Sequence, residues 1–195
     1  MTTRAAQGQA TRDHLVTVAT RLFGEQGYEG TSIEDVLGAA GVSRGALYHH
    51  FAGKEALFEA SLQLINGRVT ERLLELIADA PTAVAALHEA AVGWISLAGD
   101  PVFSRIALLD GPAVLGWEHW RVQSGQALGQ MRDMLQAVSD EGRLAAQLVN
   151  SFAHILLASL DEIALMIAQA EDREAAMAEG RLAVEELLHR LIAPA

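Results

Sequence analysis

The 195-residue sequence contains no cysteine and a single lysine, and aromatic residues make up only 5% of it. The absence of cysteine excludes disulfide bridges and thiolate chemistry, and it is compatible with a reducing cytoplasm. No run of 18 residues lacks a charged side chain, and the start of the chain has no apolar segment typical of a signal peptide. We therefore expect a cytoplasmic protein that does not span a membrane.

The net charge of -11 is distributed unevenly along the chain. Residues 1–55 carry five basic and six acidic side chains, whereas residues 56–195 carry nine basic and nineteen acidic ones. Nearly all of the excess negative charge therefore lies beyond residue 55. This asymmetry is typical of a DNA-facing module attached to an acidic body.

The amino-terminal region shows signals for short helices. Apolar residues recur at helical spacing from Leu15 to Phe23 and Gly27 follows as a stop, which predicts a first helix over about 11–26. The run Thr31-Ser32-Ile33-Glu34 matches a capping box, with Thr31 as N-cap and Glu34 as its partner. It predicts a second helix that ends at Gly41. Residues 1–10 lack apolar periodicity and are expected to form a flexible arm.

A third short helix is predicted after Ser43, its expected N-cap. A turn of three residues, 41–43, then joins two short helices, which is the pattern of a helix-turn-helix. Advancing 100° per residue places Leu47 and Phe51 together on one face, which is expected to be buried. Gly45 and Ala46 then lie on the outer face, where their small size lets another molecule approach the backbone.

Hydrogen-bonding side chains flank this bare outer face. Arg44 and Tyr48 lie on one side of it and His50 on the other. The arrangement suits a helix in a DNA major groove, with Arg44 available to a guanine edge and the hydroxyl and imidazole groups available to phosphates. A short capped helix on the surface of any helical protein is the alternative for these residues taken alone.

The rest of the chain is also predicted to be helical. A helix from about Lys54 to Pro81 would be nearly 40 Å long. We expect it to be the only connection between the short amino-terminal helices and the rest of the chain. Further helices are expected over about 82–98, 101–109, 115–138, 144–169 and 173–192, with a turn forced at Asp110-Gly111-Pro112-Ala113. The predicted fold is all-α with about nine helices, divided into an arm (1–10), a helix-turn-helix domain (11–55) and a helical carboxy-terminal domain (56–195).

The two last predicted helices, 144–169 and 173–192, are apolar around much of their circumference. A helix of this kind buries more than one face. One face can meet the core of the body, and the other most simply meets a second copy of the chain. We therefore expect a homodimer in which these helices form a four-helix bundle across a two-fold axis.

A longer pattern extends over about residues 11–58, and its residues are Thr11-Arg12, Leu15, Ala19, Leu22-Phe23, Gly27-Tyr28, Thr31-Ser32-Ile33, Asp35-Val36, Ala40-Gly41-Val42-Ser43, Gly45, Leu47-Tyr48, His50-Phe51, Lys54-Glu55 and Leu57. In type and spacing together these residues resemble the amino-terminal signature of TetR-type transcriptional regulators. At Gly53 the family often has Ser, Asp or Asn as the N-cap of the next helix, and Gly still caps.

The resemblance implies an all-helical homodimer that binds a palindromic double-stranded DNA operator, usually as a repressor. A small molecule bound in the carboxy-terminal domain releases such proteins from DNA. Carried over position by position, the resemblance implies DNA contacts from Thr31, Ser43, Arg44, Gly45, Tyr48, His49, His50 and Lys54. For Lys54, a solvated side chain without a DNA contact is the alternative.

The carboxy-terminal half gives less information about the effector. We expect a pocket for a small, largely apolar molecule, lined by aromatic side chains with a histidine that fixes orientation. The residues concerned are His88, Trp94, Phe103, Trp117, Trp120 and His154, with His119 a further candidate for the histidine. An ordinary aromatic core with satisfied or exposed histidines is the alternative.

Catalytic and metal-binding constellations are missing from the sequence. Glu186 and His189 form one Glu-x-x-His motif, but a di-iron bundle needs a second motif and further carboxylates. His49 and His50 are adjacent and so point about 100° apart, which is poor geometry for one metal ion. We therefore expect no enzyme, no metal and no cofactor. A helical small-molecule-binding or scaffold dimer without DNA binding is the alternative to a regulator.

Overall fold

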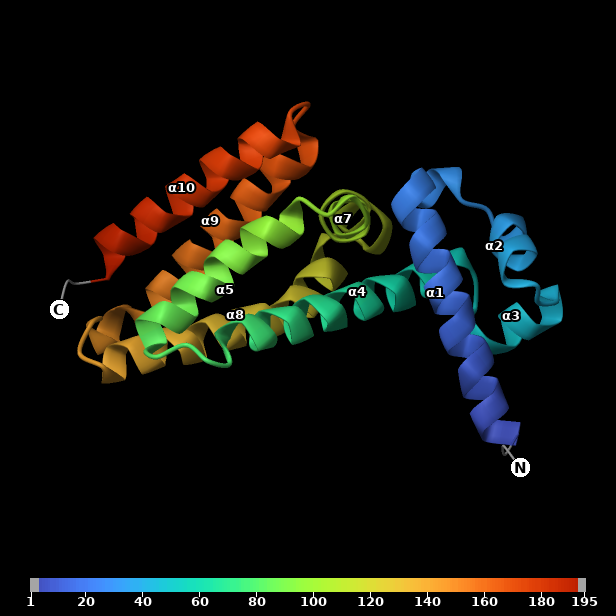
Figure 1. The fold of residues 1–195 in the computed structure, drawn as a ribbon. Coiled ribbons are helices and arrows are strands. Elements are labelled where there is room, and N and C mark those ends of the chain that lie inside the picture. Colours follow the sequence, from blue (N-terminus) through green and yellow to red (C-terminus); the bar gives the residue numbers. More distant parts are fainter. Residues whose placement is uncertain (1–3, 193–195) are drawn as a thin grey trace. The chain divides into compact units, whose positions relative to one another are not determined.

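The computed structural model describes residues 4–192, with the backbone alone for residues 4–5 and 117–125. Every regular element in residues 4–192 is helical (Figure 1), which confirms the predicted all-α class. The elements are α1 (Arg4–Gly30), α2 (Ile33–Ala40), α3 (Arg44–His50), α4 (Lys54–Ile77), α5 (Ala83–Ala98), α6 (Pro101–Phe103), the π-helix η1 (Ser104–Asp110), α7 (Gly111–Leu115), α8 (Trp117–Asp140), the short 3₁₀-helix η2 (Ala146–Leu148), α9 (Val149–Gln169) and α10 (Arg173–Leu191).

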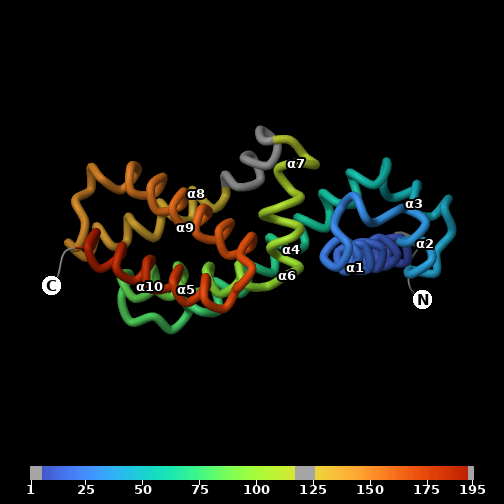
Figure 2. Tube along the Cα trace, turned by 90° about the horizontal axis from the view of Figure 1, so that it is seen from above, coloured from blue at the N-terminus to red at the C-terminus, as the bar shows by residue number. Residues whose placement is uncertain are grey.

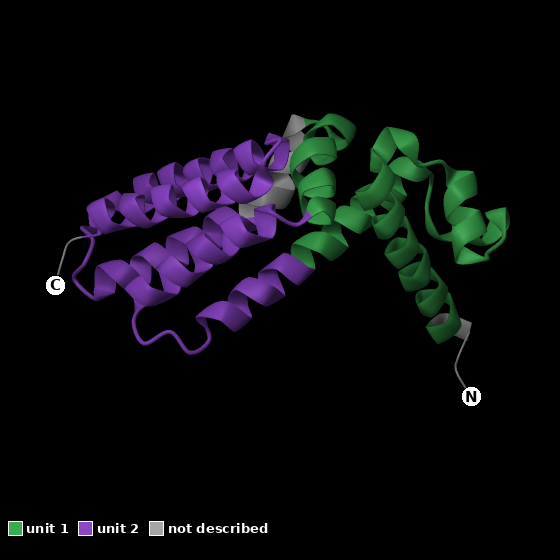
Figure 3. Ribbon diagram, turned by 45° about the horizontal axis from the view of Figure 1, so that its top comes forward, with its two compact units in different colours: residues 1–67, 101–116 green, residues 68–100, 117–195 purple. Residues whose placement is uncertain are grey.

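The chain folds into two compact units (Figure 3). Unit 1 contains the residues up to Gly67 together with Pro101–Gly116, and unit 2 contains Arg68–Asp100 and the residues from Trp117 onward. The chain therefore passes between the units at three places along its length. The prediction that α4 is the single connection between the helix-turn-helix domain and the rest of the chain is wrong, because segment 101–116 packs on α1 in unit 1.

Unit 1 is organised around α1. Its apolar face buries Leu15 and Phe23, and Leu47 of α3 and Phe58 of α4 are fully buried in the same unit. The rings of Phe23 and Phe58 meet edge to face with centroids 5.2 Å apart. α2 and α3 lie on the same side of α1 (Figure 2), and α6 and η1 also pack on α1. This packing fixes α3 at the surface of unit 1 with its apolar face inward.

The start and the end of α1 differ from the sequence-based expectation in different ways. The helix begins at Arg4, so it extends through residues that the sequence assigns to an arm, where alanine and glutamine have high helix propensity. Near its end, Gly27 has φ 77° and ψ 170°, a conformation that breaks the helix and that glycine adopts at low cost. The predicted stop at Gly27 is confirmed, although one more helical turn follows it.

Segment 101–116 is a run of three helical pieces rather than a helix followed by a turn. The expected turn at 110–113 is wrong, because Asp110 and Gly111 both keep right-handed helical angles. Pro112 lies in the first turn of α7, where its fixed φ fits the right-handed helical backbone. The chain turns instead at Gly116, which has φ 77°.

Unit 2 is a bundle in which α5, α8, α9 and α10 run alongside one another (Figure 1). Its core is built from buried aliphatic side chains of all four helices, among them Leu87, Ile95, Leu135, Leu156 and Leu188. The 146–169 stretch is long and apolar enough, with a mean hydropathy of 1.6, to cross a membrane by length and composition. Core helices of soluble proteins pass the same test, and α9 is one of the helices that line this core.

Candidate nucleic-acid interface

The turn between α2 and α3 has the predicted geometry. Gly41 takes the left-handed conformation, with φ 65°, and its N–H donates to the Leu37 carbonyl oxygen at 3.0 Å. Ser43 is the N-cap of α3, and its hydroxyl accepts from the Ala46 N–H at 3.2 Å. Both caps satisfy helix-end groups that would otherwise need water. The helix-turn-helix over 33–50 is therefore held by local hydrogen bonds.

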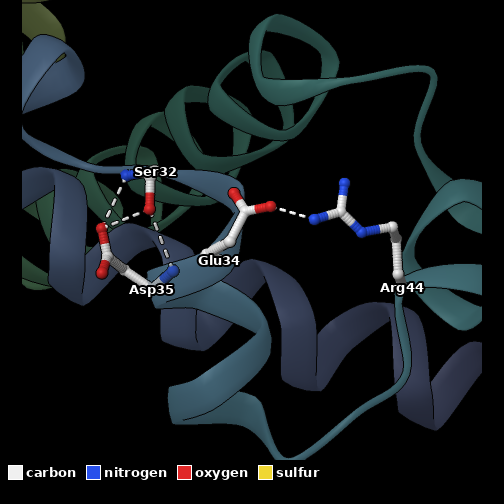
Figure 4. Close-up of polar contacts among 4 residues, drawn as sticks. All are labelled: Ser32, Glu34, Asp35 and Arg44. Carbon is white, nitrogen blue, oxygen red and sulfur yellow. Dashed lines mark hydrogen bonds and ion pairs between the residues drawn. The ribbon is translucent and has the colours of Figure 1, made fainter.

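The capping box of α2 is displaced by one residue from the predicted position. Ser32, not Thr31, is the N-cap, and Asp35, not Glu34, is its partner (Figure 4). The Asp35 carboxylate accepts from the Ser32 N–H at 2.8 Å and from its hydroxyl at 2.6 Å, and the Asp35 N–H donates to the Ser32 hydroxyl at 3.1 Å. The Ser32 side chain and then its N–H hold the pKa of Asp35 below its ordinary value.

Thr31 has a structural role in this geometry. Its side chain is 1% exposed, and its hydroxyl lies 2.9 Å from the Gly27 carbonyl oxygen and 3.2 Å from that of Leu22. The hydroxyl therefore ties the loop before α2 to the end of α1. This burial argues against a DNA contact from the Thr31 side chain.

The two faces of α3 differ as the sequence predicts. Leu47 is 0% exposed and Phe51, which follows the helix, is 4% exposed. On the other side, Tyr48 is 48% exposed, His49 is exposed, and a Cβ atom on Gly45 would meet nothing within 4 Å. The outer surface of α3 thus combines open space above the backbone with exposed hydrogen-bonding groups.

Arg44, the first residue of α3, forms an ion pair that the sequence does not reveal. Its guanidinium donates from Nη2 to Oε1 of Glu34 in the first turn of α2 (Figure 4). The pair bridges the two helices across the turn, and both side chains are mostly exposed. From its spacing to Thr31, the sequence predicts that Glu34 belongs to the capping box of α2. The structure shows that Glu34 pairs with Arg44 instead.

The histidines near α3 pack on one another and on the helix ends. The rings of His49 and His50 meet edge to face with centroids 5.0 Å apart, and His50 is half-buried. His14 on α1, which the sequence did not single out, has its Nε2 atom 3.1 Å from the Ala40 carbonyl oxygen at the end of α2. Among the described residues, no group of three or more His, Cys, Asp or Glu side chains could hold a metal ion.

Lys54, the first residue of α4, is held at an aromatic ring. Its Nζ atom lies 4.1 Å from the centroid of the Tyr28 ring, within the range of a cation–π contact. Tyr28 in turn packs against Phe23 and Phe58, with centroid distances of 5.9 and 5.1 Å. Burial, followed by the carboxylates of Glu55 and Glu29, raises the pKa of Tyr28, so its phenol stays neutral at physiological pH. Lys54 therefore lies against the end of α1, at the start of the helix that follows the helix-turn-helix in the chain.

The side chains expected to line an effector pocket fall into different parts of the structure. His88, Trp94 and His154 belong to unit 2, whereas Phe103 is buried in unit 1. The indole N–H of Trp94 donates to the Leu160 carbonyl oxygen at 3.3 Å, and exposed His154 has its Nε2 atom 3.4 Å from Nη2 of Arg132. The side chains of Trp117, His119 and Trp120 lie outside the described residues.

Two family models match the chain and together span most of it. Residues 15–61 match the model described as "Bacterial regulatory proteins, tetR family". Residues 84–191 match the model described as "Tetracyclin repressor-like, C-terminal domain". The amino-terminal match contains α2, α3 and the turn between them, and the carboxy-terminal match covers more than half of the chain.

Individual proteins show the same relationship. The HTH-type transcriptional repressor NicS of Pseudomonas putida is 28% identical over 162 residues, which are 80% of this chain and 76% of that protein. The HTH-type transcriptional regulator AcrR of Shigella flexneri is 43% identical over 75 residues, 38% of this chain and 35% of that protein. The crystal structure of a TetR-family transcriptional regulator from Pectobacterium atrosepticum has 32% identity, 99% coverage of both chains and a TM-score of 0.85. With this agreement in sequence and fold, the chain belongs to the TetR family of DNA-binding transcriptional regulators.

Proposed function

We propose that this protein is a homodimeric repressor that binds a palindromic operator and is released by a small, largely apolar molecule. The proposal rests on the outer face of α3, where exposed hydrogen-bonding groups surround the open space above Gly45. A helix with this surface can enter the major groove, and a two-fold dimer places two such helices in successive grooves about 34 to 36 Å apart.

Each side chain of this surface has a proposed role. Arg44 reads a guanine edge, because its guanidinium can donate two parallel hydrogen bonds to the O6 and N7 atoms. Gly45 gives clearance for close approach to the DNA. The remaining residues contact phosphates and hold the helix in register, and they are Ser43, Tyr48, His49, His50 and Lys54.

The dimer is proposed to form through α9 and α10. Four large apolar side chains on this part of unit 2 are well exposed: Leu148 (38%), Ile155 (48%), Met166 (60%) and Leu182 (67%). Ile155 and Met166 of α9, and Leu148 directly before it, share one side by their spacing, away from the face that packs in the core of unit 2. A second copy of the chain would remove this stripe from water and build a four-helix bundle.

The effector is proposed to bind in unit 2. It favours a state of the dimer in which the distance between the two α3 helices no longer matches the spacing of successive major grooves. For a hundredfold loss of DNA affinity, the effector must bind the two states with free energies that differ by about 2.7 kcal/mol. A few contacts to side chains such as Trp94 and His88 can supply that difference. Affinity for DNA and the absence of cysteine agree with a cytoplasmic location.

Operator selection tests the proposal directly. Random duplex DNA is passed over the purified dimer, bound sequences are amplified, and the selected sequence is measured against scrambled DNA by gel shift at several salt concentrations. We expect an inverted repeat bound at least about a thousandfold more tightly than scrambled DNA. A folded dimer that binds no DNA at low salt would instead favour the scaffold alternative.

A further inference from the structure

The ion pair between Glu34 and Arg44 uses only part of the arginine. Nη2 is the guanidinium nitrogen that contacts the carboxylate (Figure 4). A guanidinium has five N–H groups on three nitrogen atoms, and a guanine edge needs only two of them. Arg44 can therefore keep its contact with Glu34 and still present two donors to a base.

Two adjacent carboxylates at the start of α2 have different partners. Asp35 turns toward Ser32 and completes the helix cap, whereas Glu34 turns toward Arg44 on the next helix (Figure 4). The cap of α2 therefore does not depend on Glu34. Arg44 lies in the first turn of α3, which has no acidic residue of its own. Glu34 supplies the compensating negative charge from the neighbouring helix.

The pair also changes how Arg44 responds to DNA. A free arginine on this surface would be drawn to any phosphate and would add to binding at every sequence. With Glu34 beside it, the charge of the guanidinium is partly offset and its orientation is restricted. An oriented arginine loses less conformational entropy when it meets a matching guanine, so its remaining donors favour a base over a phosphate.

On this basis we propose that Glu34 is a specificity-determining positioning residue for DNA recognition. It holds the Arg44 guanidinium in place so that the arginine discriminates between bases rather than binding phosphates indiscriminately. The inference rests on the proposed DNA-binding function and names a residue outside the set expected to touch DNA. Glu34 acts through Arg44, and both residues remain paired in the specific complex.

The chain offers a matched control for removing this carboxylate. Glu25 pairs with Arg21 at 2.9 Å on α1, and both side chains are about as exposed as those of Glu34 and Arg44. Glu34→Gln and Glu25→Gln therefore make the same chemical change, raise the net charge equally and each release an arginine. The two variants differ in whether the released arginine belongs to α3.

The experiment measures the ratio of affinities for the selected operator and for scrambled DNA. Glu34→Gln should lower this ratio roughly threefold to fivefold, the size expected for an exposed ion pair, through tighter binding to scrambled DNA. Glu25→Gln should leave the ratio unchanged. In an Arg44→Ala background, Glu34→Gln should no longer change the ratio, because Glu34 is proposed to act only through its ion pair with Arg44.

The possible results separate the two proposals. Equal ratios for Glu34→Gln and Glu25→Gln, or an effect of Glu34→Gln that persists without Arg44, would overturn the role of Glu34 while leaving DNA binding intact. Failure of the unaltered protein to select any sequence would overturn the proposed function itself. Thermal melting of each variant checks that its fold is as stable as that of the unaltered protein, as expected while the Ser32–Asp35 cap of α2 stays in place.

Discussion

The carboxylate of Asp110 accepts a hydrogen bond from the backbone N–H of Tyr28 at 2.8 Å, joining residues 82 positions apart in the chain. Tyr28 directly follows Gly27, whose positive φ breaks α1 and leaves helix-end N–H groups without a helical partner. The last residue of η1 thus caps a break in the helix that supports the helix-turn-helix. This hydrogen bond adds to the packing of α6 and η1 on α1, which joins segment 101–116 to unit 1.

Replacing Asp110 should destabilise the protein. In Asp110→Ala the Tyr28 N–H, which is partly buried, loses its acceptor, so we expect the free energy of unfolding to fall by about 1–3 kcal/mol. Asp110→Asn keeps an acceptor oxygen and should lose clearly less. Urea unfolding of both variants checks the difference. Equal stability of Asp110→Ala and the unaltered protein would show that water replaces the carboxylate at no cost.

Truncating Arg44 should mainly affect the operator complex. Arg44→Ala removes the proposed donors to guanine, so binding to the selected operator should weaken by about 1–3 kcal/mol while binding to scrambled DNA changes little. Fluorescence anisotropy with labelled duplexes measures both affinities. A uniform loss on every sequence would identify Arg44 as a phosphate contact instead.

Tyr48 should behave in the opposite way. Its side chain is 48% exposed on the outer face of α3, and its hydroxyl is proposed to contact phosphate. Tyr48→Phe removes that hydroxyl and keeps the ring, so affinity for operator and for scrambled DNA should fall by similar factors. The same anisotropy titrations give the two values. A loss confined to the operator would assign the hydroxyl to a base.

Asp161 on α9 should make the protein less stable as pH rises. Burial raises the pKa of its carboxyl from 3.8 to about 6. The folded protein therefore binds more protons than the unfolded chain between these values, and stability falls as pH increases through that window and is level above it. Asp161→Asn should be more stable at pH 7 by on the order of 2 kcal/mol, allowing for the partial solvent contact of the carboxyl.

Thermal melting from pH 4 to pH 8 tests this directly. The difference between Asp161→Asn and the unaltered protein should be smallest near pH 4 and should reach its full value above about pH 6. A constant difference over the whole range would mean that the asparagine acts through packing rather than through ionisation.

The proposed dimer interface can be broken with one charge. Ile155→Glu would place a carboxylate on the exposed apolar stripe of α9, and a buried unpaired charge is strongly unfavourable. Sedimentation velocity should show a shift toward monomer. Leu74→Glu is the matched control, because Leu74 is 56% exposed but lies on α4. If Ile155→Glu stays as dimeric as the control, the interface lies elsewhere.

Local signals predicted the centre of the candidate site well. Gly41 ends α2, Ser43 caps α3 and Leu47 is buried, because each of these outcomes depends on residues within one or two turns of helix. The register of the α2 cap was missed for a different reason. Thr31 and Ser32 both precede an acidic residue at the right spacing, and the burial of Thr31, a tertiary property, decides between them.

The contacts between distant parts of the chain could not be predicted. Nothing near Asp110 in the sequence points to Tyr28, and the Gly-Pro pair after it favoured a turn over the helical run that forms. Lys54 was correctly placed at the start of α4, but its contact with the Tyr28 ring depends on the fold of α1. Such pairings leave no periodic pattern, because they join elements that pack only in the folded protein.

Lys54 is the only lysine in the sequence and one of the proposed DNA contacts, and its amine lies over the Tyr28 ring near the end of α1. A reagent that acylates amines can therefore modify a single side chain in the whole protein, apart from the α-amino group. The mass increase of the one peptide that contains residue 54 then gives a covalent footprint of this position. Protection of Lys54 from acylation when operator DNA is added would show that DNA binds next to this side chain, without any substitution in the chain.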